Sequence, residues 1–348
     1  MSSTKRALIA VGVMALILVA AAGAYLYRLH RPLAGTSKGS APGILDELPA
    51  DAPAVAYIDV AALRKLQNSP LAAILGFTGS PQADREYSEF VRNTGFDYTR
   101  DLDRAAIAFW PTSLTLAANS AGDNPALAIA SGRFDKQKIE AYALHAGGKA
   151  ESRGTESLYI VPGSPTVSFA FRSPTEIAIA SGRTSADLLG SSAAGHIDPS
   201  MQARIDRVAG APIFAVVRMD NLPAAFYQNF ANAPQLERIV HSIRGLSLAG
   251  QPQDNQIHLV LDAECDSMTS AAGVSTILDG FRLLGSMALA DPKTRRQLQM
   301  TPEQIELLEA VVHRAQVTHQ DRWVRIALDI DPAMLGSDSK QASRQPEN

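Results

Sequence analysis

The densest group of ionisable side chains in this sequence is the run Asp97–Arg104, which reads Asp-Tyr-Thr-Arg-Asp-Leu-Asp-Arg. Closely spaced carboxylates are groups that bind calcium or exchange protons in catalysis. The run lacks the central glycine and the closing glutamate of an EF-hand loop. We therefore interpret it as a solvated turn before a strand at Ala105. In this turn Asp101 or Asp103 accepts hydrogen bonds from backbone amides, and a neighbouring arginine pairs locally.

Other residues that carry chemistry are scattered along the chain. The single cysteine, Cys265, has no CxxC partner, and we expect it to be a small buried side chain. No two histidines have the i, i+4 spacing of a helical zinc site; they are His30, His145, His196, His241, His258, His313 and His319. We predict no catalytic residue, no metal ligand and no cofactor. The alternative is a hydrolase site assembled in three dimensions from Asp59, Asp97, Asp101 and His258.

The most apolar stretch is residues 7–27, which carry no charge. Lys5 and Arg6 precede it, and Arg28 and Arg31 come after it. About 20 apolar residues in a helix span the roughly 30 Å hydrocarbon core of a bilayer. A lone apolar segment in lipid forms a helix, because its backbone polar groups must be paired internally. We expect a transmembrane helix that contacts the lipid bilayer through residues 7–27.

The start of the chain predicts an N-terminal signal anchor over residues 1–31. Lys5 and Arg6 favour a cytoplasmic N-terminus, and Arg28, Arg31 and Lys38 oppose it with nearly equal weight. The signal-like layout of the segment favours a C-terminal bulk outside the cytoplasm. A signal peptide is the alternative, because Ala22-Gly23-Ala24 is a small-x-small cleavage site and cleavage near Ala24 would release a secreted protein.

Composition indicates a globular protein beyond the apolar segment. The chain has 348 residues, a net charge of −3, 46% hydrophobic residues and 6% aromatic residues. Nothing in this charge balance favours a nucleic-acid partner. Residues 32–50 are rich in Pro, Gly, Ser and Ala and are interpreted as a flexible linker. Residues 337–348 are polar, which is typical of a disordered tail.

Between the linker and the tail, one pattern occurs twice. Residues 52–63, APAVAYIDVAAL, match residues 211–222, APIFAVVRMDNL, with Ala56 equivalent to Ala215. Each segment predicts a strand that leads into a helix. We expect an internal duplication with a first α+β repeat over residues 51–205 and a second over residues 206–336.

Periodicity predicts the elements of the second repeat. Residues 257–264 and 323–330 alternate apolar and polar side chains, which indicates half-buried strands. Between them lie two predicted helices. The apolar face of the first comprises Val274, Ile277, Leu278, Phe281 and Leu284, and the glycines that interrupt it, at positions 273, 280 and 285, predict close packing. The second helix begins at residue 301 with a capping box and a proline in its first turn.

Short predicted strands also fill the first repeat, over residues 157–161, 166–172 and 176–180, with Pro-Gly and Ser-Pro turns between them. Hairpins therefore dominate the chain. The predicted fold class is α+β, with mostly antiparallel sheets and helices packed on one face, preceded by one transmembrane helix.

The opening Leu48-Pro49-Ala50-Asp51-Ala52-Pro53, the strand Ala56-Tyr57-Ile58-Asp59-Val60 and the later stretch 95–104 resemble a group of bacterial membrane-anchored envelope proteins with domains of unknown function. The resemblance covers most of residues 48–335. It implies an envelope location and a non-catalytic role, and it supplies no site residues.

The expected function is a single-pass protein of the bacterial inner membrane with an extracytoplasmic binding or scaffolding module. Its partner would be an envelope protein of unknown identity. Two alternatives stay open beside it. One is the envelope hydrolase described above. The other is a carrier of apolar small molecules on a concave sheet lined by small aliphatic side chains.

Overall fold

A computed structural model describes residues 43–65, 85–110, 125–153, 156–163, 166–182, 185–186, 189, 197–222, 234–253, 256–292, 295 and 302–330. The apolar segment 7–27 and the tail 337–348 lie outside these residues. Among the residues that are described, no helix is long and apolar enough to cross a membrane.

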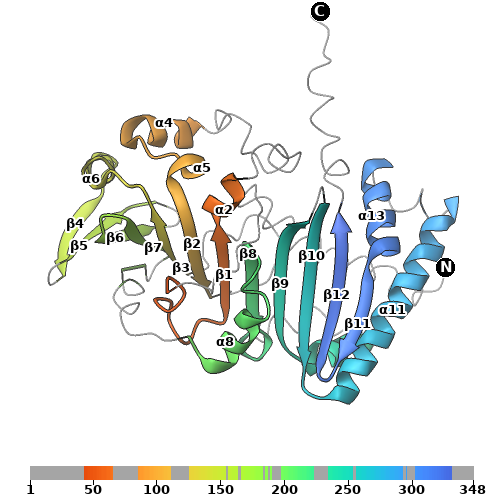
Figure 1. Cartoon of the computed structure of the whole chain (residues 1–348). Coiled ribbons are helices and arrows are strands. Elements are labelled where there is room, and N and C mark those ends of the chain that lie inside the picture. Colours follow the sequence, from red (N-terminus) through yellow and green to blue (C-terminus); the bar gives the residue numbers. More distant parts are fainter. Residues whose placement is uncertain are drawn as a thin grey trace, which may run out of the picture.

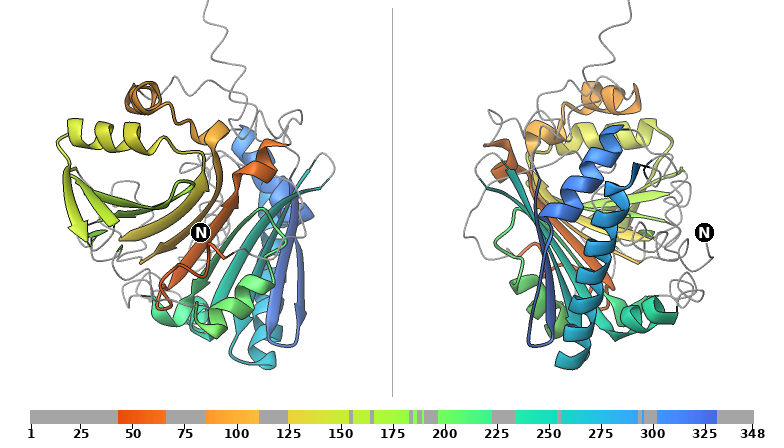
Figure 2. Two further views of the ribbon diagram at one scale, coloured as in Figure 1. Left: turned by 60° about the vertical axis from the view of Figure 1, so that its left-hand side comes forward. Right: turned by 90° about the vertical axis from the view of Figure 1, so that its right-hand side faces the viewer.

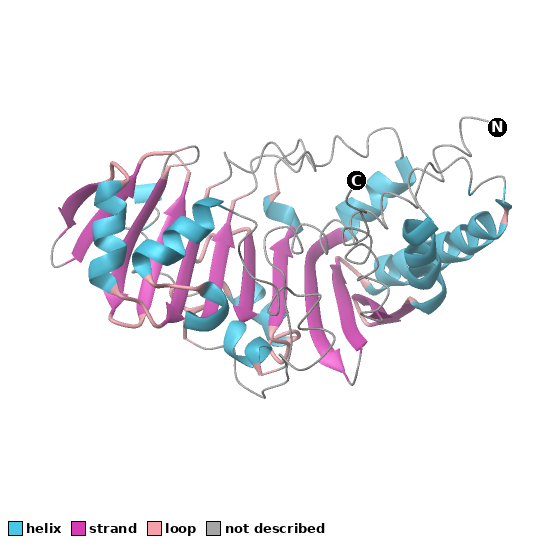
Figure 3. Ribbon diagram, turned by 90° about the horizontal axis from the view of Figure 1, so that it is seen from above, coloured by secondary structure: helices cyan, strands magenta, loops and turns pink. Residues whose placement is uncertain are grey.

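One twelve-stranded antiparallel sheet forms the centre of the described structure (Figures 1 and 3). Its spatial order is β11-β12-β10-β9-β8-β1-β2-β3-β7-β6-β5-β4. The strands are β1 (Ala54–Asp59), β2 (Leu102–Phe109), β3 (Ala126–Gly132), β4 (Lys149–Arg153), β5 (Glu156–Val161), β6 (Val167–Ser173), β7 (Glu176–Ser181), β8 (Ile213–Arg218), β9 (Ile243–Gln253), β10 (Gln256–Cys265), β11 (Gln316–Gln320) and β12 (Trp323–Ile330). The α+β class and the antiparallel sheet are therefore confirmed.

Helices connect these strands. They are α2 (Val60–Arg64), α4 (Arg85–Thr94), α5 (Tyr98–Asp101), α6 (Lys136–His145), α8 (Pro199–Asp206), the short 3-10 helix η3 (Met219–Asn221), α10 (Pro234–Ser242), α11 (Met268–Ala290) and α13 (Pro302–Arg314). As expected from the two matched segments, β1 leads into α2 and β8 leads into η3.

The two matched segments meet in the middle of the sheet. Strands β1 and β8 pair antiparallel, and Ala56 lies directly opposite Ala215. The backbone N–H of Asp59 donates to the carbonyl of Pro212 at 2.7 Å, and that of Arg218 donates to the carbonyl of Pro53 at 2.7 Å. Asp59 corresponds to Arg218 and Pro53 to Pro212 in the two matched segments, so the two hydrogen bonds are equivalent when the segments are exchanged.

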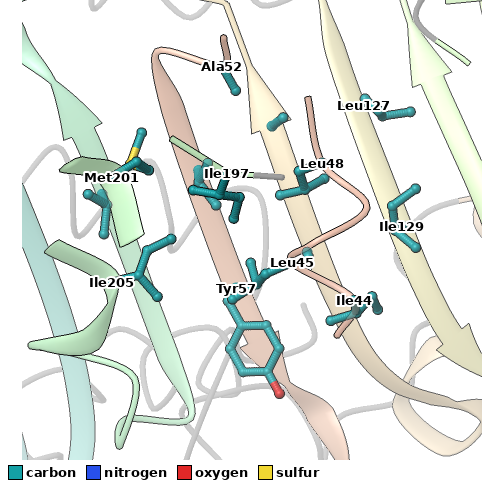
Figure 4. Close-up of a cluster of buried hydrophobic side chains, with 14 of the residues drawn as sticks. Ile44, Leu45, Leu48, Ala52, Tyr57, Leu127, Ile129, Ile197, Met201 and Ile205 are labelled. Atoms are coloured by element: carbon teal, nitrogen blue, oxygen red, sulfur yellow. The ribbon is translucent and has the colours of Figure 1, made fainter. Parts of the chain in front are cut away.

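A large hydrophobic cluster covers one face of the sheet at this junction (Figure 4). Tyr57 of β1 stacks on Phe214 of β8 with ring centroids 5.2 Å apart. Helix α8 packs over β8 and β9, and Met201 and Ile205 are almost fully buried there. The cluster contains side chains from both predicted repeats, so the described parts of residues 51–205 and 206–336 share one core.

Part of the predicted linker belongs to this core. Residues 43–50 form turns, and Ile44, Leu45 and Leu48 are buried against the sheet (Figure 4). The interpretation of residues 32–50 as a flexible linker is therefore wrong from residue 43 onward. The prediction relied on the Pro and Gly content of the segment and overlooked three apolar side chains within five residues, which are buried because they pack against the sheet.

Further helices cover the opposite face of the sheet (Figure 2). In the first half, Ile139 and Ala143 of α6 pack among aromatic side chains of β5 and β6. In the second half, α11 buries Ala271 and Val274 against Ala263 of β10. With α8 on one face and α6 and α11 on the other, the expectation of helices on one face only is wrong. The central strands are apolar on both sides and need cover on both.

Helix α11 differs in detail from the sequence interpretation. Val274 is buried and Leu278 packs against the core beside it, but Leu284 is exposed. Only Gly285 of the three helix glycines has a packed neighbour, Val312 of α13, at 3.6 Å from a built Cβ. The Cβ positions of Gly273 and Gly280 face open space, so close packing does not explain those two glycines.

Candidate functional site

The acidic run Asp97–Arg104 forms a capped turn. The Asp97 side chain accepts a hydrogen bond from Thr99 N at 2.9 Å, which caps α5. Asp101 Oδ2 accepts from Asp97 N at 3.0 Å, and Arg100 pairs with the same carboxylate. Burial alone would raise the pKa of Asp101, but the hydrogen bonds from Arg100 and Asp97 N lower it. This confirms the interpretation as a local turn, although the strand begins at Leu102.

The residues of the hydrolase alternative do not converge on one site. Asp59 caps α2 by accepting a hydrogen bond from Ala62 N at 2.7 Å. His258 Nδ1 lies 2.6 Å from Asp329 Oδ1 on the neighbouring strand. Strands β8 and β9 separate β1 from β10, so about 14 Å divides these two places at a spacing of about 4.8 Å per strand. In the described part of the chain, no group of three His, Cys, Asp or Glu side chains could hold a metal ion.

A different group of charged residues does converge, on the face of β10 that α11 does not cover. Asp262 and Glu264 lie two residues apart on this strand and point to the same face. Asp262 is 0% exposed and Glu264 is 7% exposed. Buried carboxylates require paired cations or hydrogen bonds, because removal of an ion from water costs several kcal/mol. Two pairs of arginines provide them.

Asp262 is held by Arg325 and Arg207. Arg325, its cross-strand partner on β12, donates from Nε at 2.7 Å and from Nη2 at 2.6 Å. This two-pronged contact matches the planar fork of guanidinium to the carboxylate. Its hydrogen bonds raise the pKa of Arg325 above its usual value. Arg207, which comes directly after α8, places Nε 3.5 Å from Asp262 Oδ2.

Glu264 is held by Arg204 and Arg322. Arg204 of α8 donates from Nε to Oε2 at 2.7 Å, and Arg322 Nη2 lies 2.8 Å from Oε1. Arg204 is 5% exposed and passes directly over Gly245 of β9, where a Cβ would come within 2.3 Å of Nε. Glycine is required at this position because the arginine takes up the space of a side chain.

Arg207 and Arg322, the partly exposed arginines of these ion pairs, help to line a pocket of about 540 Å³. The Arg207 guanidinium lies over the ring of Trp323, 4.0 Å from its centroid, in a cation–π contact. Two further walls come from the β11–β12 turn and from the N-terminus of α11. The pocket is lined by Arg207, Asp266, Ser267, Met268, Gln320, Asp321, Arg322 and Trp323.

Local backbone chemistry positions these walls. The Ser267 side chain accepts from Ser270 N and caps α11. Hydrogen bonding to Ser270 lowers the pKa of Asp266, so its carboxylate is ionised at neutral pH. In the β11–β12 turn, Asp321 has φ of 53°, in the left-handed region that aspartate tolerates better than most residues. The next residue, Arg322, accepts a hydrogen bond from Cys265 N at its carbonyl, which ties the turn to β10.

Cys265, which follows Glu264 on β10, is buried in the cluster with Ala263 and Ala271. Burial, together with the negative charges of Asp266 and Glu264, raises the pKa of its thiol to about 11. The thiol is therefore protonated at neutral pH and is a poor nucleophile. This confirms the expectation of a small buried side chain.

Sequence reasoning missed this pocket. The alternation of residues 257–264 places Asp262 and Glu264 on the face away from the apolar side chains, as observed. A half-buried strand predicts that this face is exposed to water, whereas both carboxylates are buried. The arginines that pair with them lie about 60 positions away in the sequence, in both directions. Two acidic residues on one face of a strand, with a tryptophan and an arginine on a later strand and a second arginine just before it, were the only signal.

The comparisons with known proteins add little to this geometry. No protein-family model matches the chain, and no curated protein is similar to it at a significant level. Solved structures of a protein designated TP0453 are similar at 11% identity. Its crystal form III gives a TM-score of 0.45 over 88% of this chain and 99% of that one, and its crystal form I gives 0.41 over 86% and 96%. We infer nothing about function from a likeness at this level.

Proposed function

We propose that this chain is a single-pass, membrane-anchored protein whose extracytoplasmic α+β region is a non-catalytic binding module at a bacterial envelope. The single observation that supports a binding role is the pocket between α8, α11 and the β11–β12 turn. Its arginines are held from below by buried carboxylates, so their orientation is set before any ligand arrives. Preorganised donors of this kind favour binding, because less side-chain entropy is lost on association.

The proposed anchor is the sequence segment 7–27, whose length and lack of charge suit a bilayer. We further propose that the two halves arose by duplication. The direct pairing of Ala56 with Ala215 and the matching pair of hydrogen bonds at its ends support this proposal. So does the burial of Leu63 and Leu222, which close the two matched segments.

The two alternatives receive less support. The residues of the hydrolase alternative are engaged in helix capping and in ion pairs at separate places. For the carrier alternative, the first half of the sheet would need an open apolar surface. Instead Tyr159, Phe169 and Phe171 are buried there in mutual ring contacts under α6.

A fractionation experiment tests the anchor. The full-length chain should stay with bacterial membranes after an alkaline carbonate wash, and protease added to spheroplasts should digest its C-terminal region. Leu16→Arg combined with Leu18→Arg should release the protein, because each arginine costs about 2.5–3.5 kcal/mol at the centre of a membrane helix. The matched control is alanine at both positions. Recovery of the uncleaved wild-type chain in the cytosol would overturn the proposal.

A second experiment tests the binding role. Mild crosslinking in intact cells, followed by solubilisation and purification of the full-length chain, should recover an envelope partner. The absence of any partner, together with turnover in a broad hydrolase screen, would contradict a non-catalytic role.

A further inference from the structure

The pocket beside Trp323 has donors that its own side chains leave unused. The Arg207 side chain is 34% exposed and meets Asp262 only through Nε, at 3.5 Å. It makes no other polar contact among the described residues, so both Nη groups keep their hydrogen-bonding capacity. Arg322 uses Nη2 for Glu264, and its side chain is 59% exposed at the same opening. Two guanidinium groups therefore present free N–H donors to one pocket.

The geometry of these donors points to a planar anion. A guanidinium group binds a carboxylate through two parallel N–H···O bonds, and stacking on an aromatic ring fixes the plane of the fork. The ring of Trp323 holds Arg207 in this way. The N-terminus of α11 at Ser267 adds a partial positive charge to the same pocket.

The remaining walls limit the ligand further. Asp266 and Asp321 also line the pocket, and their negative charges disfavour a dianion such as a phosphate monoester. Met268 lines the pocket with 66% of its surface exposed, beside the half-buried ring of Trp323. An apolar group attached to the anion would cover this exposed surface and gain the free energy of its burial.

We propose that this pocket binds a singly charged carboxylate attached to an apolar body, with Arg207 and Arg322 as the carboxylate-binding residues. The inference rests on the proposed binding role and deepens it by naming the chemical class of ligand. A small apolar carboxylic acid and the C-terminal carboxylate of an apolar peptide share this chemistry, and the experiment separates them.

The test uses the full-length chain in detergent micelles, with Trp323 as the reporter. The sequence contains two tryptophans, so Trp110→Phe leaves Trp323 as the single fluorophore. Three probes of one shape and different charge are titrated: cyclohexanecarboxylate, its neutral carboxamide and cyclohexylphosphonate. The carboxylate should change the fluorescence of Trp323 saturably and bind about tenfold or more tightly than either other probe. Equal binding of the carboxamide, or a preference for the phosphonate, would overturn the proposal.

Variants assign the binding to the named residues. Arg207→Gln should weaken carboxylate binding about tenfold or more, and Arg207→Lys should restore only part of it, because lysine lacks the planar fork. Asp262 keeps its two bonds to Arg325 in these variants, so the fold is retained; the thermal unfolding midpoint checks this. Arg322→Gln provides a second test at an exposed position. The matched control is Arg282→Gln on α11, an exposed arginine with one ion pair to Asp279, which should change binding less than about twofold.

Peptides distinguish the two sources of the carboxylate. N-acetyl-Leu-Leu with a free C-terminus is compared with the same peptide amidated. Binding of the free peptide more tightly than cyclohexanecarboxylate identifies a chain terminus as the ligand, and the reverse order identifies a small acid. If Arg207→Gln and Arg282→Gln have the same effect on every probe, the pocket assignment is wrong, whatever the fractionation experiment shows about the anchor.

Discussion

Replacement of Gly245 by alanine should destabilise the protein through one side chain, Arg204. A Cβ at this position would lie 2.3 Å from Nε and 2.8 Å from Cδ and Cζ of Arg204. These are atoms in the middle of a buried side chain, so the contact cannot be relieved by movement of a flexible tip. The arginine must either accept the strain or leave its place beside Glu264.

The two outcomes have similar costs. Overpacking of a buried position costs about 1–3 kcal/mol. Loss of the charge-assisted bond to Glu264 costs about 1.5–3 kcal/mol. The protein adopts whichever outcome costs less free energy, so the folded state should be destabilised by about 2 kcal/mol. Alanine also restrains the unfolded chain relative to glycine, which returns about 0.5–1 kcal/mol. We expect a net loss of about 1–2 kcal/mol in the free energy of unfolding.

A double-mutant cycle, with urea unfolding of the full-length chain in detergent micelles, measures the interaction between a Cβ at position 245 and Arg204. In an Arg204→Ala background the arginine side chain is absent, so Gly245→Ala should change from destabilising to neutral or slightly stabilising. The coupling energy should be about 2 kcal/mol. Gly210→Ala, where a Cβ meets nothing within 4 Å, is the matched control and should be neutral or raise the free energy of unfolding by up to about 1 kcal/mol. An equal cost for Gly245→Ala in both backgrounds would refute the reasoning.

Other parts of the fold support three more predictions. Gly273→Ala, at an exposed helix position with open space for a Cβ, should raise the free energy of unfolding by about 0.5–1 kcal/mol, and a lower melting temperature would contradict this. Cys265 should resist iodoacetamide at pH 8 until urea unfolds the chain, because burial raises its pKa to about 11; rapid labelling of the native protein would show that the thiol is accessible. Burial, with a smaller contribution from Glu176, raises the pKa of Glu47, so its ionised form destabilises the native state at neutral pH. Glu47→Gln should therefore raise the melting temperature at pH 7, with a gain that vanishes as the pH falls through the pKa of Glu47. A gain in melting temperature that is the same at pH 7 and below the pKa of Glu47 would point to a cause other than charge.

Local patterns predicted most individual elements. The alternation of residues 257–264 and 323–330 indicated β10 and β12, and the two strands pair over that length. The same reasoning identified α13, whose predicted start at residue 301 lies one position before Pro302, and it identified α11 without setting its ends. It missed the edge strands β4 and β11, because β4 alternates charged residues with the small residues Ala150 and Ser152, and β11 has a single apolar residue, Val317.

The candidate site could be predicted only in fragments. Asp101 was correctly interpreted as a turn residue whose carboxylate accepts a backbone amide, because its partner, Asp97 N, lies four positions away along the chain. The capping role of Asp97 was not predicted. The pocket beside Trp323 depends on pairs such as Arg204 with Glu264 and Arg325 with Asp262, which are about 60 positions apart. No spacing rule connects such residues, since their contact depends on the order of strands in the sheet.

By itself the sequence determined the class of elements, their approximate bounds and the capping of their ends, because these depend on hydrophobic period and on hydrogen bonds over a few residues. Tertiary structure decided which surfaces are covered. It buried Leu45 and Leu48 of a segment that resembles a linker, left Leu284 of α11 exposed, and covered Asp262 and Glu264 on the polar face of β10 with arginines. Burial is a property of the assembled sheet and helices, so a residue's own neighbours in the chain cannot specify it.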